Sequence, residues 1–241
     1  MEKRNDISVN GIGDISGGEY NDIHIAGVAN IRGDINSNKI SVDGKAKSHG
    51  KINSNYLSIN GHFTCNNDVQ VRASCDVNGF YKVLGNINGN RIVVNGRTTI
   101  TENINFDNVE VNGELIVNGN CQCENVKLYG KMMVDGLLSG DNIELNITRF
   151  NKIKEIGGEK LVVKRGIDTG FKVFSILNGS KPKLVCEEIE ADEIYLENTD
   201  CNIVRGRNIE IGRGCTINRI EYSGELKITC SKSIINEKIN V

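Results

Sequence analysis

A pentapeptide of the form apolar-x-apolar-x-Gly recurs through the first 145 residues of this 241-residue chain. Its eight copies end at Gly11, Gly27, Gly44, Gly61, Gly79, Gly96, Gly113 and Gly130. Successive glycines are 16, 17, 17, 18, 17, 17 and 17 residues apart. A fixed period of this length is typical of a solenoid, in which each repeat packs only on its neighbours.

The residues around each glycine alternate in polarity. Positions four and two before the glycine are apolar in all eight copies, and the position between them is polar in seven. Apolar residues recur about four and eight positions after the glycine, and Asn, Asp and Gly lie between these runs. Alternation predicts strands with one buried face, and residues that tolerate positive φ predict corners. Three strands per coil predict an all-β fold, a triangular parallel β-helix (β-solenoid) of about 17 residues per coil.

The repeat also predicts how the chain is divided. Residues 1–146 are expected to form a regular β-helix of about eight coils. The glycine register is lost over 147–183, where we expect an insertion or hairpin-like connector with strands at 161–164 and 171–176. Alternation returns after Pro182 and predicts a second, short β-solenoid segment over 184–230. Residues 231–241 are expected to be a polar tail.

Charge and hydropathy exclude several classes of protein. The formal net charge is −2, and Lys and Arg are scattered, so no basic patch for nucleic acid is present in the sequence. No apolar run approaches the roughly 18–20 residues of a membrane span. The N-terminus is charged and has no apolar signal-peptide core. We therefore expect a cytoplasmic protein.

The eight cysteines are expected to fill the core. Four of them fall at positions that the register directs inward, and two more occupy apolar positions of the second segment: Cys65, Cys75, Cys121 and Cys123, then Cys201 and Cys215. A buried free Cys behaves as a small hydrophobic residue. The sequence Cys121-Gln122-Cys123 lacks the C-x₂-C spacing of a zinc site. We expect no metal and no cofactor.

No candidate catalytic cluster emerges from the sequence. Left-handed β-helix acyltransferases use a His base, but their coils have 18 residues and a hexapeptide rhythm, and His24 is predicted to lie on an outer face. His49 and His62 are expected to lie on the surface. Acid pairs such as Asp14 with Asp34, or Glu187 with Glu188, are expected to be solvated. The chain is therefore not expected to be an enzyme.

Two sets of motifs resemble the bactofilins, or polymer-forming cytoskeletal proteins. The first is the repeat followed by Gly33-Asp34-Ile35 or Gly85-Asn86-Ile87. The second comprises residues 189–199, 204–212 and 220–222, which resemble the C-terminal segment of longer members from Gram-positive, spore-forming lineages. The resemblance implies a right-handed β-helix that polymerises end to end without nucleotide. Many members carry a hydrophobic N-terminal membrane tail; here about six charged or polar residues stand there, so membrane attachment is not expected.

The expected function is a nucleotide-independent, self-assembling cytoskeletal scaffold that organises a cell-shape, envelope or motility process. Its expected partner is another copy of the chain or a paralogous bactofilin. The terminal coils are expected to provide the assembly interface, through Ile7, Val9, Ile12 and Ile15 at one end and Ile217, Ile220, Tyr222 and Leu226 at the other. The alternatives are a non-polymerising β-helix module that docks a protein partner, and a β-helix acyltransferase or sugar-acting enzyme.

Overall fold

The computed structural model describes residues 4–166 and 181–241. Among these residues every regular element is a β-strand, and the strands pair in parallel with the equivalent strand of the next coil. The chain divides into two compact units, Met1–Gly119 and Asn120–Val241. The predicted all-β parallel β-solenoid is confirmed in each unit.

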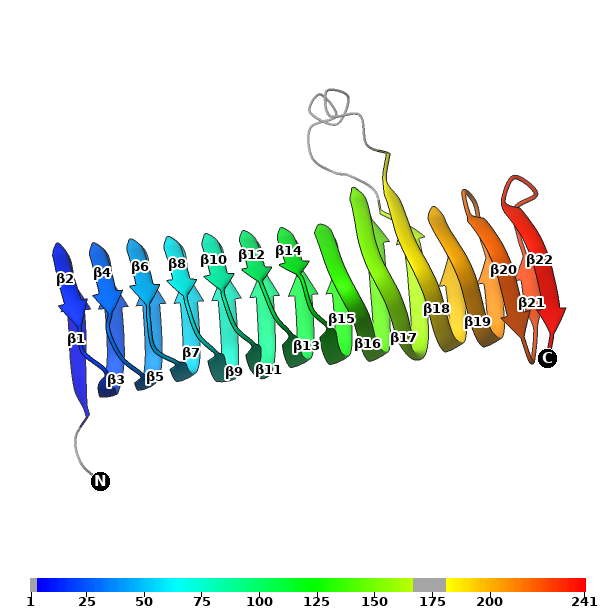
Figure 1. Cartoon of the computed structure of the whole chain (residues 1–241). Coiled ribbons are helices and arrows are strands. Elements are labelled where there is room, and N and C mark those ends of the chain that lie inside the picture. Colours follow the sequence, from blue (N-terminus) through cyan, green and yellow to red (C-terminus); the bar gives the residue numbers. More distant parts are fainter. Residues whose placement is uncertain (1–3, 167–180) are drawn as a thin grey trace. The chain divides into compact units, whose positions relative to one another are not determined.

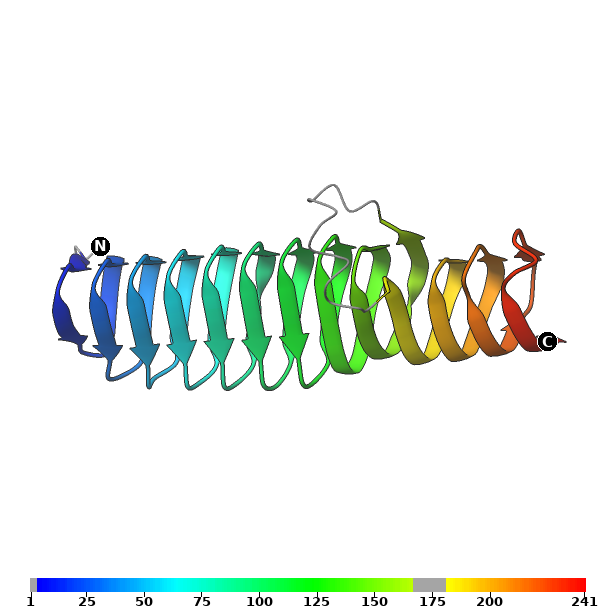
Figure 2. The same cartoon turned by 90° about the horizontal axis from the view of Figure 1, so that it is seen from above.

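Each coil of the first unit contains one short and one long strand (Figure 1). The short strands are β2 (Ile12–Ile15), β4 (Val28–Ile31), β6 (Lys45–Ser48), β8 (His62–Cys65), β10 (Phe80–Val83), β12 (Arg97–Ile100) and β14 (Glu114–Val117). The long strands are β1 (Asn5–Val9), β3 (Gly18–Ile25), β5 (Ile35–Val42), β7 (Ile52–Ile59), β9 (Val69–Val77), β11 (Ile87–Val94) and β13 (Ile104–Val111). Seen from above, the coils of this unit follow one another in a single stack (Figure 2).

Each long strand contains a corner, so two strands form three faces. In β5, Ile35 and Ser37 are buried, Asn38 and Lys39 are not, and burial resumes at Ile40. Two successive residues outside the core reverse the phase of the alternation, and the strand bends there. The triangular cross-section predicted from three apolar runs therefore holds, although two of the runs belong to one continuous strand.

The core consists of columns of equivalent residues from successive coils. The apolar positions predicted from the repeat are buried throughout the inner coils, as in the column Ile23, Ile40, Leu57, Cys75, Ile92 and Val109. One further inward column lies two residues after the repeat glycine: Ala29, Ala46, Phe63, Tyr81, Thr98 and Leu115. Within it the Phe63 and Tyr81 rings stack with centroids 5.5 Å apart. Sequence reasoning missed this column because its residues share no single chemical type.

The repeat glycines are required by the distance between coils. A Cβ built at Gly44 would lie 2.0 Å from the carbonyl oxygen of Gly27, and one at Gly61 would lie 2.0 Å from that of Gly44. Any side chain at these positions would collide with the backbone of the preceding coil. The glycines thus permit the close approach of successive corners, and none of those in the repeat needs a positive φ.

A ladder of side-chain amides follows the same corner. The Nδ2 group of each Asn donates to the Oδ1 atom one coil earlier, at 2.7 Å from Asn60 to Asp43 and at 2.9 Å from Asn78 to Asn60. The ladder continues through Asn95 and Asn112, again at 2.9 Å. Asp43, which has only acceptor oxygens when ionised, receives the last of these hydrogen bonds. The ladder therefore satisfies polar groups that the corner would otherwise expose.

The second unit is built from longer strands that run through the corners. They are β15 (Cys121–Leu128), β16 (Lys131–Ile147), β17 (Phe150–Arg165), β18 (Lys183–Leu196), β19 (Thr199–Ile211), β20 (Thr216–Tyr222), β21 (Leu226–Ile228) and β22 (Ile234–Asn240). Strand β16 is 17 residues long, so this one strand forms a whole coil.

The structure corrects the expectation of a hairpin-like connector over residues 147–183. Strand β17 pairs in parallel with both β16 and β18, so residues 150–165 continue the solenoid. Because Met133 pairs with Lys152, Asn151 lies opposite Met132, two residues after the repeat glycine Gly130. Its buried side chain accepts from the Met132 N–H at 2.7 Å and donates to the Arg149 carbonyl at 2.9 Å. The expected strand at 171–176 lies outside the described residues.

The expectation of a polar tail over residues 231–241 also needs correction. Strand β22 lies within it and pairs in parallel with β20, where Ile217 faces Ile235 and Ile220 faces Lys238. The segment is polar, as expected, but its backbone adds a further strand to the solenoid. Polar composition concealed this strand because alternation of apolar residues is the signal on which strand prediction depends.

Candidate assembly surface

The first coil, formed by β1 and β2, leaves apolar side chains uncovered. Ile7 and Val9 occupy inward positions and are only half-buried. Their equivalents one coil later, Ile23 and Ile25, are 1% and 0% exposed. The difference arises because no described strand packs on the other side of β1. Ile7 and Val9 therefore form an apolar surface at the start of the first unit.

The other two candidates of this coil differ in position. Ile12 points outward and is 89% exposed, so it extends the apolar surface onto the rim of the coil. Ile15 points inward and is 1% exposed, so its side chain cannot contact a partner directly. Of the four residues predicted at this end, Ile7, Val9 and Ile12 are accessible.

The backbone of the first coil is also open on one side. Val9 O accepts from Ala26 N at 3.0 Å, and Gly11 O accepts from Val28 N at 2.8 Å, which joins this coil to the second. Along its other edge, β1 pairs with no strand among the residues that the structure describes. An open edge beside apolar side chains is a template for further strand pairing.

Gly11 is the one repeat glycine of the first unit with space around its missing side chain. A Cβ built there would meet no atom within 4 Å, whereas one at Gly27 would lie 1.9 Å from the oxygen of Gly11. Later glycines are needed because another coil precedes them. The backbone at Gly11 is thus shaped for the close approach of a coil that this chain does not supply from its described residues.

Acidic groups around the first coil already have partners. Arg4 lies 2.9 Å from Glu19, and Arg32 lies 2.8 Å from Asp14. The hydrogen bond from Arg32 lowers the pKa of Asp14. Asp6 accepts from Asn21 Nδ2 at 2.9 Å. Arginines thus compensate the charges of Glu19 and Asp14, whereas Asp6 is bound by a neutral amide.

The candidates at the other end of the chain are less accessible. Ile217 and Ile220 are 0% exposed, because Ile235 and Lys238 of β22 lie against them. Tyr222 and Leu226 are half-buried. Strand β22 thus separates the predicted interface residues Ile217 and Ile220 from solvent.

The cysteines lie where the register directs them. Seven of the eight are buried, and Cys230 is half-buried. Burial raises the pKa of the Cys65 and Cys75 thiols, and raises that of Cys215 to about 11. Thiols that resist ionisation are poor nucleophiles and poor metal ligands. No group of three or more His, Cys, Asp or Glu residues in the described part of the chain is arranged to hold a metal ion.

The histidines lie on the surface in structural contacts. His24 Nδ1 is 3.5 Å from Asp43 Oδ2, and His49 Nδ1 is 3.5 Å from Asn66 Nδ2. The His62 ring stacks on Phe80, with centroids 5.0 Å apart. Each histidine belongs to a different coil and has a different neighbour, so the structure brings no two of them together.

The acid pairs considered from the sequence also have separate partners. Asp14 pairs with Arg32, while Asp34 Oδ1 accepts from the Lys51 N–H at 2.8 Å. Glu188 contacts Arg205. In place of a carboxylate pair, Asp14, Asp34 and Glu188 each take part in a contact between neighbouring coils.

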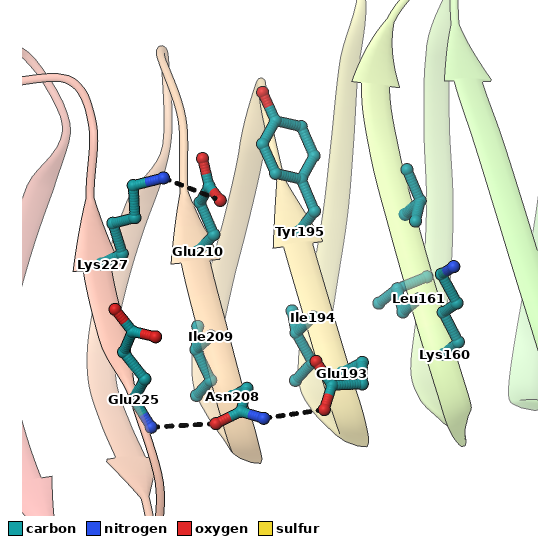
Figure 3. Close-up of a pocket in the computed structure, with 11 residues that line it drawn as sticks. Lys160, Leu161, Glu193, Ile194, Tyr195, Asn208, Ile209, Glu210, Glu225 and Lys227 are labelled. Atoms are coloured by element: carbon teal, nitrogen blue, oxygen red, sulfur yellow. Dashed lines mark hydrogen bonds and ion pairs between the residues drawn. The ribbon is translucent and has the colours of Figure 1, made fainter.

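A shallow depression of about 380 Å³ lies on the outer face of the second unit (Figure 3). Its polar groups bind one another. Asn208 donates to Glu193 at 2.8 Å and accepts from the Glu225 N–H at 3.0 Å, and Lys227 lies 3.4 Å from Glu210. These contacts link adjacent strands across the depression. The arrangement is that of a cross-strand ladder and does not direct several polar groups at one ligand.

The family comparison matches the repeat region. Residues 65–148 match the family described as bactofilin, polymer-forming cytoskeletal. Over this segment the chain is similar to the bactofilins. The match includes coils of the regular repeat together with β15 and β16, so the bactofilin signal lies in the solenoid itself. The expected likeness of residues 189–222 to the C-terminal segment of longer bactofilins lies outside the match and stays a prediction.

Two relatives from Bacillus subtilis (strain 168) share part of the sequence. The chain is 42% identical to uncharacterized protein YhbF over 87 residues, which is 36% of this chain and 33% of that protein. Identity to uncharacterized protein YhbE is 45% over 53 residues, 22% of each chain. The matches thus span a third or less of either relative. No solved structure is significantly similar to the chain.

The structure also contains no helix, among its described residues, of the length and hydropathy that crossing a membrane would require.

Sequence reasoning missed two features of the assembly surface. The first is the open space at Gly11, which only the contrast with Gly27 reveals. The second is strand β22. Its only sequence signal was Ile235 at an inward position, because the next inward position, three residues later, holds the polar Lys238.

Proposed function

We propose that the chain is a cytoskeletal scaffold that associates with copies of itself through its first coil. The observation that carries the proposal is the uncovered inner face of this coil, where Ile7 and Val9 stay half-exposed beside the open edge of β1. Capping or pairing of terminal coils is a general requirement of solenoids. The match of residues 65–148 to a family described as polymer-forming supports the same conclusion.

In this proposal assembly needs no nucleotide and no cofactor, and the protein acts in the cytoplasm without catalysing a reaction. Pairing of strand edges and burial of apolar side chains supply the free energy of association. The buried thiols and the separately placed histidines are accounted for by core packing and by contacts between coils. The scaffold would organise a cell-shape, envelope or motility process, as the resemblance to bactofilins implies.

Sedimentation velocity and negative-stain microscopy of the purified chain without nucleotide test the proposal. We expect defined oligomers at micromolar concentration. Ile7→Asp should shift the protein to monomers, since it places a charge in the apolar face of the first coil. Ser8→Asp is the matched control, because Ser8 is exposed on the same strand and points away from that face. A chain that stays monomeric over a wide range of concentration and salt would disprove self-assembly.

One observation favours the alternative of a module that docks a different protein. Phe80 and Leu84 of one coil are 51% and 40% exposed on the first unit. Phe80→Asp should abolish capture of a stoichiometric partner if this flank is the docking surface. Self-association that survives Phe80→Asp but fails with Ile7→Asp would favour the scaffold.

A further inference from the structure

The short strands of the first unit carry a basic face whose residues are dispersed in the sequence. In β4, β6, β8, β10 and β12 the first and third residues point outward, and these strands lie side by side (Figure 1). Their outward side chains include three lysines, an arginine and a histidine, and no acid. Strand register aligns them in two columns, which we name the basic strip: Val28, Lys45, His62, Phe80 and Arg97, then Asn30, Lys47, Thr64, Lys82 and Thr99.

Three cations of the basic strip have no protein partner. The side chains of Lys45, Lys47 and Lys82 are exposed and form no ion pair or hydrogen bond with any residue in the described part of the chain. Arg97, by contrast, lies 2.9 Å from Glu114. The strip therefore carries uncompensated positive charge, although the formal net charge of the whole chain is −2.

Two aromatic rings lie among these lysines. The rings of His62 and Phe80 stack on neighbouring coils, with centroids 5.0 Å apart and 17° between their planes. Phe80 is 51% exposed, and His62 is exposed as well. Lys45 is aligned with His62, and Lys82 follows Phe80 by two residues on the same strand. Free cations beside exposed aromatic rings are the combination with which proteins bind single-stranded nucleic acid, because cations contact the phosphates and bases stack on the rings.

The dimensions of the basic strip disfavour a folded protein as its ligand. Five strands spaced by about 4.8 Å, each of four residues at about 3.3 Å, give a face of roughly 300 Å². A specific protein complex buries about 800 Å² on each partner. Strands β6, β8 and β10 are each paired on both sides, so they offer no free edge to an extended peptide. A single flexible polyanion needs neither a large area nor a strand edge.

We propose that the basic strip binds single-stranded nucleic acid without sequence preference. Lys45, Lys47 and Lys82 contact phosphates, and bases stack on the rings of His62 and Phe80. Contacts to phosphate carry no sequence information, and every base can stack, so the base order of the ligand has little effect. Such binding goes beyond self-association and does not depend on it, because the strip is formed by inner coils of the first unit.

Fluorescence anisotropy of the full chain with labelled oligothymidylate and, separately, labelled oligouridylate tests the proposal and distinguishes DNA from RNA. We expect a micromolar dissociation constant at low salt for at least one of them. Three phosphate contacts predict that the logarithm of the association constant falls with the logarithm of salt concentration with a slope of about −2. Absence of binding by both oligonucleotides at low salt would overturn the proposal.

Removal of single charges locates the phosphate contacts. Lys47→Gln and Lys82→Gln should each weaken binding about three- to tenfold and should each reduce the salt slope by about 0.7 in magnitude. Lys39→Gln is the matched control, because Lys39 is exposed on the long strand β5, aligned with Tyr56, and lies outside the strip. If Lys39→Gln weakened binding as much as Lys47→Gln, the assignment to the strip would be wrong.

Removal of one ring tests the stacking. Phe80→Ala should weaken binding about tenfold and leave the salt slope unchanged, since it removes a stacking surface and no charge. Tyr56→Ala, at a ring 49% exposed on the long strand β7, should leave the affinity unchanged. Equal affinities of wild type and Phe80→Ala would refute the proposal. So would displacement of the oligonucleotide by poly-glutamate or by phosphatidylglycerol vesicles at the same charge concentration, because the strip would then select charge alone.

Discussion

The carbonyl oxygen of Gly11 occupies the space that a side chain at Gly27 would need, since a Cβ at Gly27 would lie 1.9 Å from that oxygen. The same relationship recurs between successive repeat glycines, as between Gly44 and Gly61 at 2.0 Å. The repeat glycine is thus a requirement of the coil before it, and no coil among the described residues packs before Gly11. This difference separates the role of glycine in folding from its role at the assembly surface.

Gly61→Ala should therefore destabilise the fold, and Gly11→Ala should not. The added methyl group at Gly61 meets backbone that cannot move without disturbing strand pairing, so we expect a loss of about 1–3 kcal/mol or more. At Gly11 the loss should stay within about 0.5 kcal/mol, while self-association weakens. Urea denaturation gives the first quantity and sedimentation the second. Equal destabilisation by both substitutions would contradict this account.

The two phenylalanines of neighbouring coils form a second matched pair. Phe63 is fully buried and stacks on Tyr81, whereas Phe80 is 51% exposed and stacks on His62. Phe63→Ala should cost about 3–5 kcal/mol, because it removes a buried ring and leaves a cavity. Phe80→Ala should change stability by about 0.5 kcal/mol or less. Thermal unfolding of both variants measures the difference, and similar midpoints would refute the assignment of inner and outer faces.

The sequence was sufficient for the regular coils because their period was carried by residues of one type. The column that contains Ile40 and Leu57 is aliphatic in most coils, and Gly44 marks the corner in a fixed place. By contrast, the column through Phe63, Tyr81 and Thr98 has no common chemistry and escaped detection. Its members are united only by the space inside the coil, which sequence alone does not display.

The candidate site was only partly predictable for a related reason. Ile7 and Val9 were identified because they begin the repeat, and the structure leaves them uncovered. Ile217 and Ile220 were expected to be terminal, but β22 covers them. Strand β22 is held largely by backbone pairing and Ser233, and backbone hydrogen bonds leave little trace in side-chain patterning.

Alkaline pH should destabilise the chain through its buried thiols. Burial raises the pKa of Cys75 and Cys65 above the ordinary value of 9.0. Above this value the unfolded thiols lose protons that the folded thiols retain. The unfolded state then binds fewer protons, so the free energy of unfolding falls as pH rises. The contribution is complete below pH 9 and declines above it, by at most about 1.4 kcal/mol per thiol for each pH unit.

Urea denaturation between pH 7 and pH 10.5 measures this decline. Cys75→Val keeps an apolar side chain of similar size and removes one titrating group, so its decline above pH 9 should be shallower than that of wild type. Cys230→Val is the control, because Cys230 is only half-buried. Parallel curves for wild type and Cys75→Val would show that this thiol ionises equally in both states.

Arg205 should control the ionisation of Glu221. Its Nε donates to Glu221 Oε2 at 2.7 Å, and this hydrogen bond is the main reason why the pKa of Glu221 is lowered. Arg205→Met should raise the pKa of Glu221, although Arg219 Nη2, 2.7 Å from Oε1, should retain part of the shift. Because the pKa of Glu221 is lower in the folded state than in the unfolded state, its ionisation stabilises the fold at pH values above the ordinary pKa of 4.5. This stabilisation is lost as the pH falls through the folded-state pKa.

The variant should therefore be less stable than wild type at neutral pH, and the gap should close as the solution is acidified or its salt concentration is raised. Carboxyl-detected NMR titration of the glutamates reports the pKa directly. Arg207→Met is the matched control, because Arg207 contacts Glu193, at 3.0 Å. It should shift the titration of Glu193 and leave that of Glu221 in place. A Glu221 titration that is unchanged in Arg205→Met would mean that Arg219 and the local backbone alone hold this carboxylate.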